Sequence, residues 1–363
     1  MAGPMDFISG LLRRPTPLVG IDIGSSAVKA VELTAAPGRR IHATAGMHAV
    51  PAGSIVKGEI VDRAAVAEAV RGLLGAADIR GRDVALSLPG GAVIAREVAM
   101  PRMSRAELAG SIAWEAGRHI PFELCDVNLD YQVVDRAGDT ERRPSMVVLL
   151  VAAKKSTIAE YAAVVTEAGC VPAVVDVAAF ALQNACALQG GFERGGVAAL
   201  LNCGASTINV NIVEGGRSVF TREIAAGGNA CTEALRRSGI PSFEEAERAK
   251  KDLSIRGAGR EDAEPVLREA TEDLLLEVEK TFDFFAASRT GGRIDRILLS
   301  GGASQGAGFA SATAGRFDVP LERFDPFHQT QVVGRQIGWR DPADLAAAAG
   351  VAAGLALRRT GDR

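Results

Sequence analysis

The sequence predicts a mixed α/β fold built from two lobes, and three observations support this prediction. The chain has 363 residues, which is long for one hydrophobic core and typical of two domains of ordinary size. Hydrophobic residues make up 47% of it, so a sizeable core is available. A unit of strand, glycine turn and strand occurs at residues 18–33 and again at residues 198–213. Such a unit, repeated half a chain later, indicates a duplicated fold.

The two copies of this unit align when one is shifted by 180 positions. The shift pairs the polar turn residues of the two copies: Asn202 with Asp22, Gly204 with Gly24, and Ser206 with Ser26. In the first copy, Ile21 and Ile23 flank Asp22, an alternation that is typical of a strand. We therefore expect two equivalent β-hairpins, one in each lobe.

The rest of the first 90 residues reads as a helix between β segments. Residues 41–61 have weaker β character. Residues 62–75 are predicted to form a helix, because Asp62 is a suitable N-cap and apolar residues follow it at helical spacing. Residues 83–88 form a short strand that ends at Pro89, Gly90 and Gly91.

Residues 91–165 have a different texture and are predicted to form a separate module. A strand at 93–100 precedes a helix from Ser104 to about residue 117, and Ser104 with Glu107 makes a capping box for it. Strands at 127–134 and 145–153 follow, joined by the charged turn 135–143. A helix at 156–169 then ends at Gly169.

The second half of the chain repeats the alternation of strands and helices. We expect a strand at 171–177, a helix at 178–188 and a lobe boundary in the glycine-rich segment 190–196. After the second hairpin come a strand at 217–224 and a helix to Ser238. Ser242 and Glu245 form another capping box. A long amphipathic helix at 266–288, a strand at 294–299 and a single last helix at 343–357 complete the prediction.

Charge and composition exclude several classes of protein. The net charge is −3, the pI is about 5.9 and aromatic residues make up only 5%, so nothing favours nucleic-acid binding. The five cysteines form no C-x-x-C pair and the four histidines have no ligand-like spacing. We therefore expect buried, reduced thiols and no metal site of the Cys/His type.

No apolar run reaches the ~18 residues that a membrane span needs, and no signal peptide is recognisable. The protein is therefore expected to be cytoplasmic. Residues 5–14 are apolar and end in two arginines, followed by Pro15 and Pro17. This stretch is either a weak amphipathic membrane contact or a frayed N-terminal tail.

The first hairpin carries the residues of a phosphate site. Gly24 allows close approach of the backbone to an anion, Ser25 and Ser26 add hydroxyl donors, and Lys29 supplies a cation for the outer phosphates. Asp22 suits a different task, which is to hold Mg²⁺ through water. The alternative for this motif alone is an ordinary hairpin turn with a surface lysine.

Three further glycine turns, each after a strand, and one helix favour a nucleotide. Gly204, Ser206 and Thr207 provide a second wall for the phosphates. Gly227, Gly228 and Asn229 open a helix whose amides and dipole favour an anion or a ribose edge. Gly301 and Gly302, after Ser300, let a flat base lie against the backbone. Glu247 and Lys250 share a helix face and could reach the ribose or base; the alternative for this pair is a surface salt bridge.

This order of motifs resembles the actin, Hsp70 and sugar-kinase superfamily over nearly the whole chain. Within it, the sequence resembles the PilM family of type IV pilus assembly proteins. The resemblance is carried by GIDIGSSAVKAVEL (20–33), GEIVD (58–62), IAWEAGRHIPFELCDVNLDYQVV (112–134), VVDVAAFALQNA (174–185), GGNACTEAL (227–235) and LLSGGAS (298–304). The stretch 112–134 is the most specific, since kinases and chaperones lack it. It lies where PilM and the cell-division protein FtsA have a subdomain called 1C.

The resemblance implies a two-lobed actin/Hsp70-like ATPase fold with an FtsA-like 1C subdomain, and ATP with Mg²⁺ bound between the lobes. After a tail at 1–17, it implies subdomain 1A at 18–90, 166–195 and 331–363, 1C at 91–165, 2A at 196–238 and 291–330, and 2B at 239–290. It assigns the first hairpin and Gly204, Ser206 and Thr207 to phosphates, Gly227–Asn229 with Glu247 and Lys250 to ribose and base, and Gly301 and Gly302 to adenosine. Asp176 matches the acidic position that orients the attacking water.

One departure concerns hydrolysis. The family usually has aspartate in the second hairpin, where this chain has Asn202. Asparagine keeps the shape but removes a negative charge near the metal. Nucleotide binding is therefore expected, with at most slow ATP hydrolysis.

The resemblance also implies a partner. PilM-like proteins bind the cytoplasmic tail of the inner-membrane protein PilN in a groove between subdomains 1A and 1C, and connect the membrane complex to the pilus motor that drives twitching motility. We expect the same here, at the cytoplasmic face of the inner membrane, with the motor ATPases and the platform protein as further candidates. Ile112, Trp114, Ile120 and Phe122 are expected to line or support this groove, although Trp114 also fits a core role.

Two other functions stay open. The first is a small-molecule kinase of the same superfamily, but beyond Asp176 the inter-lobe motifs contain no clear general base for such chemistry. The second is an FtsA-like protein that forms filaments.

Overall fold

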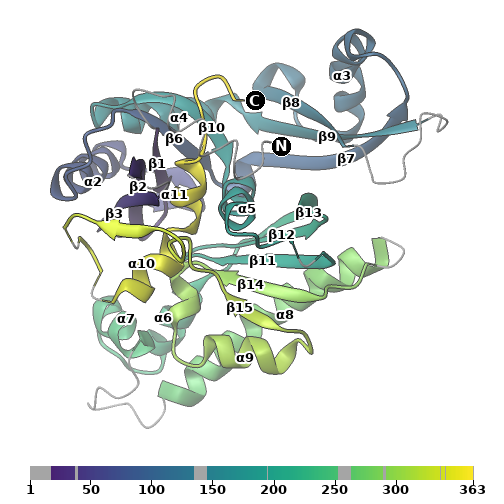
Figure 1. Cartoon of the computed structure of the whole chain (residues 1–363). Helices are drawn as coiled ribbons and strands as arrows, with labels where there is room; N and C mark the ends of the chain where they lie inside the picture. The colour runs from purple at the N-terminus through teal and green to yellow at the C-terminus, as the bar shows by residue number, and fades with distance from the viewer. Residues whose placement is uncertain are drawn as a thin grey trace.

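The computed structural model describes residues 18–36, 40–134, 145–193, 195–251, 263–288, 292–335, 337–339 and 341–362. It contains two large sheets, each covered by helices, and a smaller sheet that projects from the first lobe (Figure 1). The predicted tail at 1–17 and the charged turn at 135–143 lie outside the described residues.

The first lobe is built on a sheet with the strand order β10-β6-β1-β2-β3-β16. Its antiparallel part consists of β1 (Val19–Ile23), β2 (Ala27–Ala36) and β3 (Arg40–Ala49). On one side, β6 (Asp83–Leu88) and β10 (Val171–Val177) run parallel to β1. On the other side, β16 (Gln331–Val333) runs parallel to β3. A small ribbon of β4 (Ile55–Val56) and β5 (Glu59–Ile60) accounts for the weaker β character of residues 41–61.

The second lobe repeats this design. Its sheet has the order β13-β12-β11-β14-β15, which reproduces β3-β2-β1-β6-β10 strand for strand. The antiparallel strands are β11 (Val197–Cys203), β12 (Ile208–Glu214) and β13 (Arg217–Ile224), and the parallel ones are β14 (Arg296–Ser300) and β15 (Leu321–Arg323). The predicted duplication is confirmed.

The two hairpins are equivalent down to single hydrogen bonds. Asp22 lies opposite Lys29 in the first hairpin, and Asn202 lies opposite Asn209, 180 positions later, in the second. The turn is closed by Gly24 N donating to Ala27 O (3.1 Å) in one copy and by Gly204 N donating to Thr207 O (2.9 Å) in the other. The register of each hairpin thus follows from its turn, as expected when a short connection joins two strands.

Two helices lie between the large sheets, α5 (Ala178–Leu188) and α11 (Gly350–Leu355) (Figure 1). Both contribute to a buried cluster that also contains Ala85 from the first sheet and Leu200 from the second. The two helices touch at Gly354, where an added Cβ would lie 1.7 Å from the carbonyl oxygen of Ala181. This position therefore requires glycine. The two closely packed helices form the interface between the two lobes.

The prediction of one continuous helix at 343–357 is wrong. The structure has α10 (Pro342–Ala348) and then α11, with a break at Ala349. The reason lies in the carbonyl of Ala347, which in a continuous helix would accept a hydrogen bond from the amide four residues later. Here it accepts from Gly301 N (2.7 Å) and Ser300 Oγ (3.1 Å) instead.

The projecting module has its own core. Its sheet has the order β7-β9-β8, formed by Val93–Pro101, Ser145–Lys154 and Val127–Val134, and α3 (Arg105–His119) packs on it. The capping box of Ser104 and Glu107 is confirmed in full. The following helix, α4 (Lys155–Glu167), buries Tyr161, Val164 and Val165 in the first-lobe core together with α2 (Arg63–Ala76). The self-contained part of the module is therefore residues 93–154.

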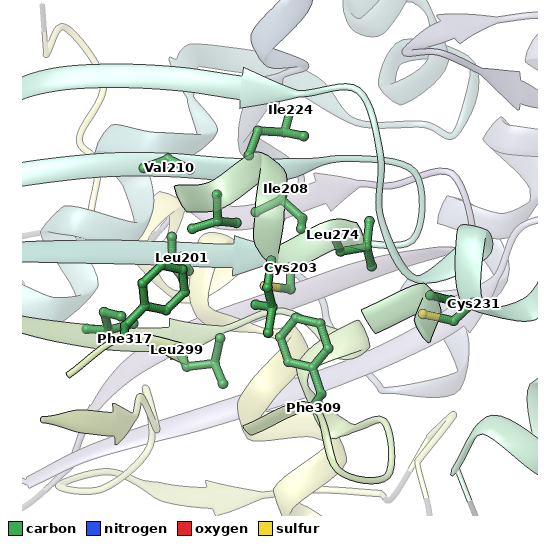
Figure 2. Close-up of a cluster of buried hydrophobic side chains, with 14 of the residues drawn as sticks. Leu201, Cys203, Ile208, Val210, Ile224, Cys231, Leu274, Leu299, Phe309 and Phe317 are labelled. Carbon is green, nitrogen blue, oxygen red and sulfur yellow. The ribbon is translucent and has the colours of Figure 1, made fainter. Parts of the chain in front are cut away.

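The helices of the second lobe are α6 (Gly228–Arg237), α7 (Phe243–Lys251), α8 (Ala263–Ser288) and α9 (Phe309–Arg316). Figure 2 shows part of its core, where Ile208 and Val210 of the sheet meet Leu274 of α8 and Phe309 of α9. Of the second predicted capping box, the structure has one half, the bond from Glu245 N to Ser242 Oγ (3.2 Å).

The five cysteines are all unpaired. Four are buried, and burial raises the pKa of the Cys203 thiol to about 12. Cys125 departs from the expectation of buried thiols, because it lies exposed in the short turn η3 (Leu124–Asp126) of the module. Within the described ranges, no helix has the length and apolar character to cross a membrane.

Candidate functional site

The first hairpin places a partly buried ion pair beside its glycine turn. Asp22 and Lys29 face each other on β1 and β2, with Lys29 Nζ 3.1 Å from Asp22 Oδ2. Their side chains are only 16% and 15% exposed, so Lys29 is no ordinary surface lysine. The hydroxyl of Ser87, at the end of β6, donates to Asp22 Oδ1 (3.4 Å). A Cβ on Gly24 would lie 2.8 Å from Lys29 Nζ, so this glycine leaves room for the cation.

The turns of the two hairpins meet between the lobes. Ser25 Oγ and Ser206 Oγ lie 2.6 Å apart, although 181 positions separate them in the chain. Ser26 and Thr207 lie in the same two turns, and Asn202 lies between Asn209 and Ser300 in the second sheet. The structure therefore brings together the two predicted walls of a phosphate site.

The turn of Gly227, Gly228 and Asn229 packs directly on the second hairpin. A Cβ on Gly227 would lie 2.5 Å from Gly204 O. Gly228 N donates to Gly204 O (3.0 Å) and Asn229 N donates to Ala205 O (2.8 Å). The sequence predicts that these amides face an anion, whereas in this structure two of them brace the hairpin. The side chain of Asn229 reaches Ser206 Oγ (3.5 Å), which is the atom that contacts Ser25 of the first hairpin.

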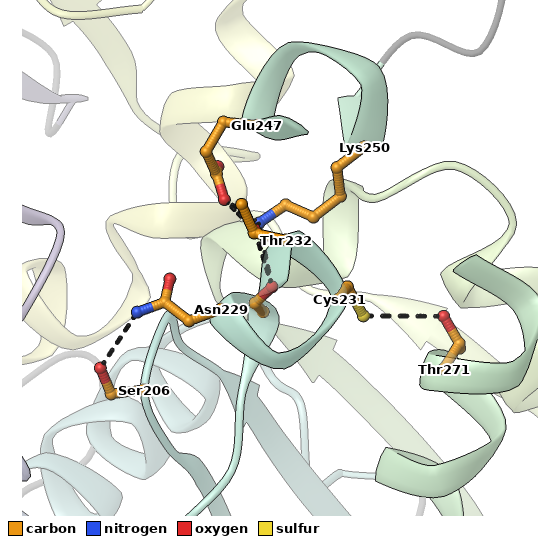
Figure 3. A network of polar contacts seen from close by, with 8 residues as sticks. Ser206, Asn229, Cys231, Thr232, Glu247, Lys250 and Thr271 are labelled. Atoms are coloured by element: carbon orange, nitrogen blue, oxygen red, sulfur yellow. Dashed lines mark hydrogen bonds and ion pairs between the residues drawn. The ribbon is translucent and has the colours of Figure 1, made fainter. Parts of the chain in front are cut away.

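Glu247 and Lys250 belong to a buried polar network (Figure 3). The ammonium of Lys250 donates to Glu247 Oε1 (2.5 Å), Thr232 Oγ1 (2.8 Å) and Gly228 O (3.1 Å), and Thr232 also hydrogen-bonds Glu247. Lys250 is 8% exposed, so the pair is not a surface salt bridge. Because a buried charge is costly unless it is paired, this network holds the lysine in one place.

A pocket adjoins this network in the second lobe. It lies between α6, α7, α8 and the turn after β14, and its lining includes Gly228, Cys231, Lys250, Thr271, Ala303 and Phe309. Burial raises the pKa of Cys231, so its thiol stays protonated and acts as an apolar wall near the Thr271 hydroxyl (4.0 Å). The pocket thus has one apolar side and one polar edge.

Gly301 and Gly302 close the strand β14 and lead into the turn η4 (Gly302–Gln305). Gly301 has a φ of 92°, and a Cβ there would lie 2.3 Å from Cys203 O. Both facts require glycine. The turn therefore brings backbone close to the second hairpin and to the pocket.

Asp176 is the last residue but one of the strand β10, where its neighbour in register is Ser87. Its carboxylate is buried and lies within ion-pair distance of an arginine. Asp176 Oδ2 lies 3.2 Å from Arg358 Nε, and Oδ1 accepts from Val177 N (2.7 Å). Burial raises the pKa of Asp176, and the guanidinium of Arg358 acts in the opposite direction. The ion pair includes no hydrogen bond, because neither Asp176 Oδ2 nor Arg358 Nε has a hydrogen-bond partner among the described residues. The positive charge of Arg358 nevertheless lies next to this carboxylate, which disfavours its use as a free base.

The residues predicted to contact a partner separate into two kinds. Ile112 and Ile120 are buried in the core of the module, so they support its shape. Phe122 is partly buried, with Lys154 Nζ 4.8 Å from its ring centroid. Trp114 is 69% exposed, which excludes the core role, and Arg118 Cζ lies 5.2 Å from its ring centroid.

Sequence reasoning missed several residues at this site. Thr232 bridges Glu247 and Lys250, Ser87 contacts Asp22, and Arg358 pairs with Asp176. Thr232 lies one helical turn after Gly228, a spacing that could have placed it beside the glycine turn. The partners Ser87 and Arg358 carry no local signal, since both contacts join distant segments.

The residues present fit a nucleotide with its metal. Glycines let the turns pack closely, because a Cβ at Gly24 would meet the Lys29 cation and a Cβ at Gly227 would meet the backbone of the second hairpin. Each lobe supplies a lysine: Lys29 lies beside the first hairpin and Lys250 lies beside Gly228 of the second lobe. Asp22 supplies a carboxylate beside the hydroxyl of Ser87, which suits a metal held through water.

Comparison with known proteins gives one decisive match. The family model of the type IV pilus assembly protein PilM matches residues 20–360, nearly the whole chain. The chain belongs to the PilM family. A chain of the solved PilM-PilN type IV pilus biogenesis complex is similar to it, with 28% identity and a TM-score of 0.80, over 95% of this chain and 98% of that chain. This PilM-family protein is therefore a type IV pilus assembly protein.

A more distant match concerns the fold alone. The ethanolamine utilization protein EutJ from Carboxydothermus hydrogenoformans is 16% identical, with a TM-score of 0.55, over 98% of this chain and 99% of that chain. The matches confirm the actin-like α/β fold of this PilM-family protein and the resemblance inferred from its motifs.

Proposed function

We propose that this protein is an ATP-binding adaptor of the type IV pilus machine, which binds the cytoplasmic N-terminal tail of a PilN-type protein. The observation that carries nucleotide binding is the meeting of two equivalent glycine hairpins at Ser25 and Ser206, 2.6 Å apart. Two hairpin turns that face each other supply backbone amides and hydroxyls from both sides, as a phosphate chain requires.

The proposed site assigns a role to each group. Gly24, Ser25, Ser26 and Lys29 hold phosphates from the first lobe, and Gly204, Ser206 and Thr207 hold them from the second. Asp22 holds Mg²⁺ through water. Asn229, Glu247 and Lys250 contact the ribose and base, which lie against Gly228, Gly301 and Gly302. Bound Mg²⁺ would neutralise phosphate charge, while the side chains fix the orientation of the nucleotide.

The partner site is proposed on the module of residues 93–154 and the adjacent surface of the first lobe. Support comes from the module itself, which contains none of the nucleotide residues and carries an exposed tryptophan, Trp114. Support also comes from the similar chain solved in a PilM-PilN complex. Through such a tail the protein would sit at the cytoplasmic face of the inner membrane, where the motor ATPases and the platform protein are further proposed partners.

The test of the adaptor function uses the purified chain and a synthetic peptide of the PilN N-terminal tail from the same organism. We expect saturable binding of the tail with a Kd of about 1–100 μM, as for a short peptide in a groove, and separate binding of ATP with Mg²⁺. Calorimetry would measure both, with a scrambled peptide as the control. Equal affinity for the scrambled peptide would reject the partner assignment, and no heat of ATP binding would reject the nucleotide site.

Hydrolysis is expected to be slow, below about 1 s⁻¹, which is under the range of most enzymes. Two features lower it: Asn202 replaces a carboxylate near the metal, and Asp176 is paired with Arg358. The same pairing disfavours the kinase alternative, which needs a free general base.

The measurement is phosphate release from the wild-type chain and from Asn202→Asp. We expect this substitution to raise turnover by about tenfold, because a restored carboxylate next to Ser300 favours metal placement. Asn128→Asp, on the exposed face of β8, is the matched control and should not change the rate. A wild-type rate of about 1 s⁻¹ or faster would favour the kinase.

A further inference from the structure

A carboxylate of the second lobe binds the chain segment that leads into the module. Glu223 lies on β13, and its side chain accepts two hydrogen bonds from the first lobe: Oε2 from Gly90 N (2.9 Å) and Oε1 from Gly91 N (2.8 Å). Gly90 and Gly91 begin the short turn η2 (Gly90–Ala92), which continues directly into β7, the first strand of the module. One side chain therefore links the second lobe to the base of the module.

The contact is fitted closely. A Cβ on Gly90 would lie 2.8 Å from Glu223 Oε2 and 2.9 Å from Asn209 Oδ1, and a Cβ on Gly91 would lie 3.3 Å from Glu223 Oε1. Any larger residue at Gly90 would push the carboxylate away. Hydrogen bonds from backbone amides to a carboxylate are charge-assisted and stronger than neutral ones. Glu223 is half-buried, so water competes less for these bonds than at an exposed site.

The contact is connected to the nucleotide hairpin by a row of strand neighbours. Asn202 on β11 faces Asn209 on β12 in register, and Asn209 faces Glu223 on β13. The row thus runs across three adjacent strands, from the hairpin that faces the cleft to the carboxylate that holds η2. A rigid sheet moves these residues together, so a movement of the second lobe at the nucleotide also moves Glu223.

The same point also touches the other end of the module. Pro89, just before η2, packs against the turn of the small ribbon, where a Cβ on Gly58 would lie 2.9 Å from Pro89 Cβ. Gly58 O accepts a hydrogen bond from the hydroxyl of Tyr161 (3.2 Å). Tyr161 lies on α4, the helix that follows the last strand of the module. The entry and the exit of the module therefore meet at the segment that Glu223 holds.

We propose that Glu223 is a latch that couples closure of the cleft between the lobes to the position of the module, and thereby couples ATP to the tail. The inference rests on the proposed function, since the module must bind the tail for the coupling to have this effect. When the lobes close on the nucleotide, the two bonds to η2 persist and carry the module along. The open and closed states of the protein therefore have different affinities for the tail.

The test uses the full-length chain, the tail peptide and Glu223→Gln. Glutamine keeps the size of the side chain, but it has one acceptor oxygen and turns an NH₂ group toward the second amide. The quantity measured is the ratio of the tail's Kd without and with ATP and Mg²⁺. We expect a ratio that differs from one by about fivefold or more in the wild-type protein, and by less than about twofold in Glu223→Gln.

Glu277→Gln is the matched control, because Glu277 is a half-buried second-lobe glutamate, like Glu223, but its carboxylate pairs with Lys280 on the same helix. It should keep the wild-type ratio. The latch would be overturned if Glu223→Gln kept the wild-type ratio, or if ATP did not change the Kd of the tail in the wild-type protein. If the wild-type protein bound no ATP or no tail at all, the proposed function itself would be rejected.

Amide hydrogen exchange gives a second measurement that needs no partner. In the wild-type protein, exchange in a peptide covering residues 88–101 should slow when ATP and Mg²⁺ are added, and in Glu223→Gln it should be faster and insensitive to ATP. Equal exchange rates in both proteins would mean that the carboxylate does not hold η2. This result would overturn the latch independently of the tail-binding measurements.

Discussion

Replacing residues 94–152 with a four-residue glycine-serine loop is expected to abolish binding of the PilN-type tail and to leave ATP affinity within about fivefold of wild type. The structure makes this exchange possible because Val93 and Ala153 are neighbours in register on the antiparallel strands β7 and β9. Their Cα atoms are then about 4.5–5.5 Å apart, which a short turn can join. The removed part has its own core, and all the proposed nucleotide residues lie outside it.

This exchange needs a control for folding, which is the cooperative thermal unfolding of the shortened chain followed by circular dichroism. Trp114→Ala is a milder second variant. Because Trp114 is 69% exposed, its loss should lower the affinity for the tail peptide without lowering the melting temperature of the protein. Ile112→Ala, in contrast, removes a buried side chain and should destabilise the module. If the shortened, folded chain still bound the tail with unchanged affinity, the partner site would lie elsewhere on the protein.

Lys29→Ala is expected to weaken ATP binding by about 10- to 100-fold, as the loss of a charge-assisted hydrogen bond predicts. The substitution removes the cation that faces the phosphates. It also leaves the carboxylate of Asp22, 3.1 Å from Lys29 Nζ in this structure, without its partner and close to the negative phosphate chain. Both effects act in the same direction. Isothermal titration calorimetry with ATP and Mg²⁺ measures the change.

Two further variants separate these effects. Lys280→Ala removes an exposed lysine that pairs with Glu277 on α8, and it should not change ATP affinity. Adding Asp22→Asn to Lys29→Ala should recover part of the loss in magnesium-free buffer, because it removes the unpaired charge. ATP affinity that stays at the wild-type value in Lys29→Ala would show that the first hairpin does not bind the phosphates.

The hairpins and the duplicated design were predictable because they are local. Each turn is a short glycine-containing connection between two apolar strands, so the register of the hairpin follows from the turn. The shift of 180 positions seen in the sequence also relates the strand registers of the two hairpins. Asp22 pairs with Lys29 in the first hairpin, and Asn202 pairs with Asn209 in the second. The capping box at Ser104 is local in the same sense, and it too was confirmed.

The last helix shows where a local pattern misleads. Residues 343–357 are rich in alanine and look like one helix, but Ser300 and Gly301 capture the carbonyl of Ala347 and the chain breaks after it. For Trp114 the sequence left a groove-lining role and a core role open, and the structure excludes the core role because the helix places this side chain on the outer face. For the last helix, a distant segment decides the outcome.

The sequence by itself determined the fold class, the family, the two hairpins and most of the residues proposed to bind the nucleotide. These depend on turns and periodicities that a short stretch of chain contains. Only the tertiary structure decided three long-range contacts. Ser25 contacts Ser206, and Arg358 forms an ion pair with Asp176. Glu223 accepts hydrogen bonds from the amides of Gly90 and Gly91. These contacts join residues more than 130 positions apart. A local pattern records where a strand ends, but which strand ends meet depends on how the two sheets pack against α5 and α11.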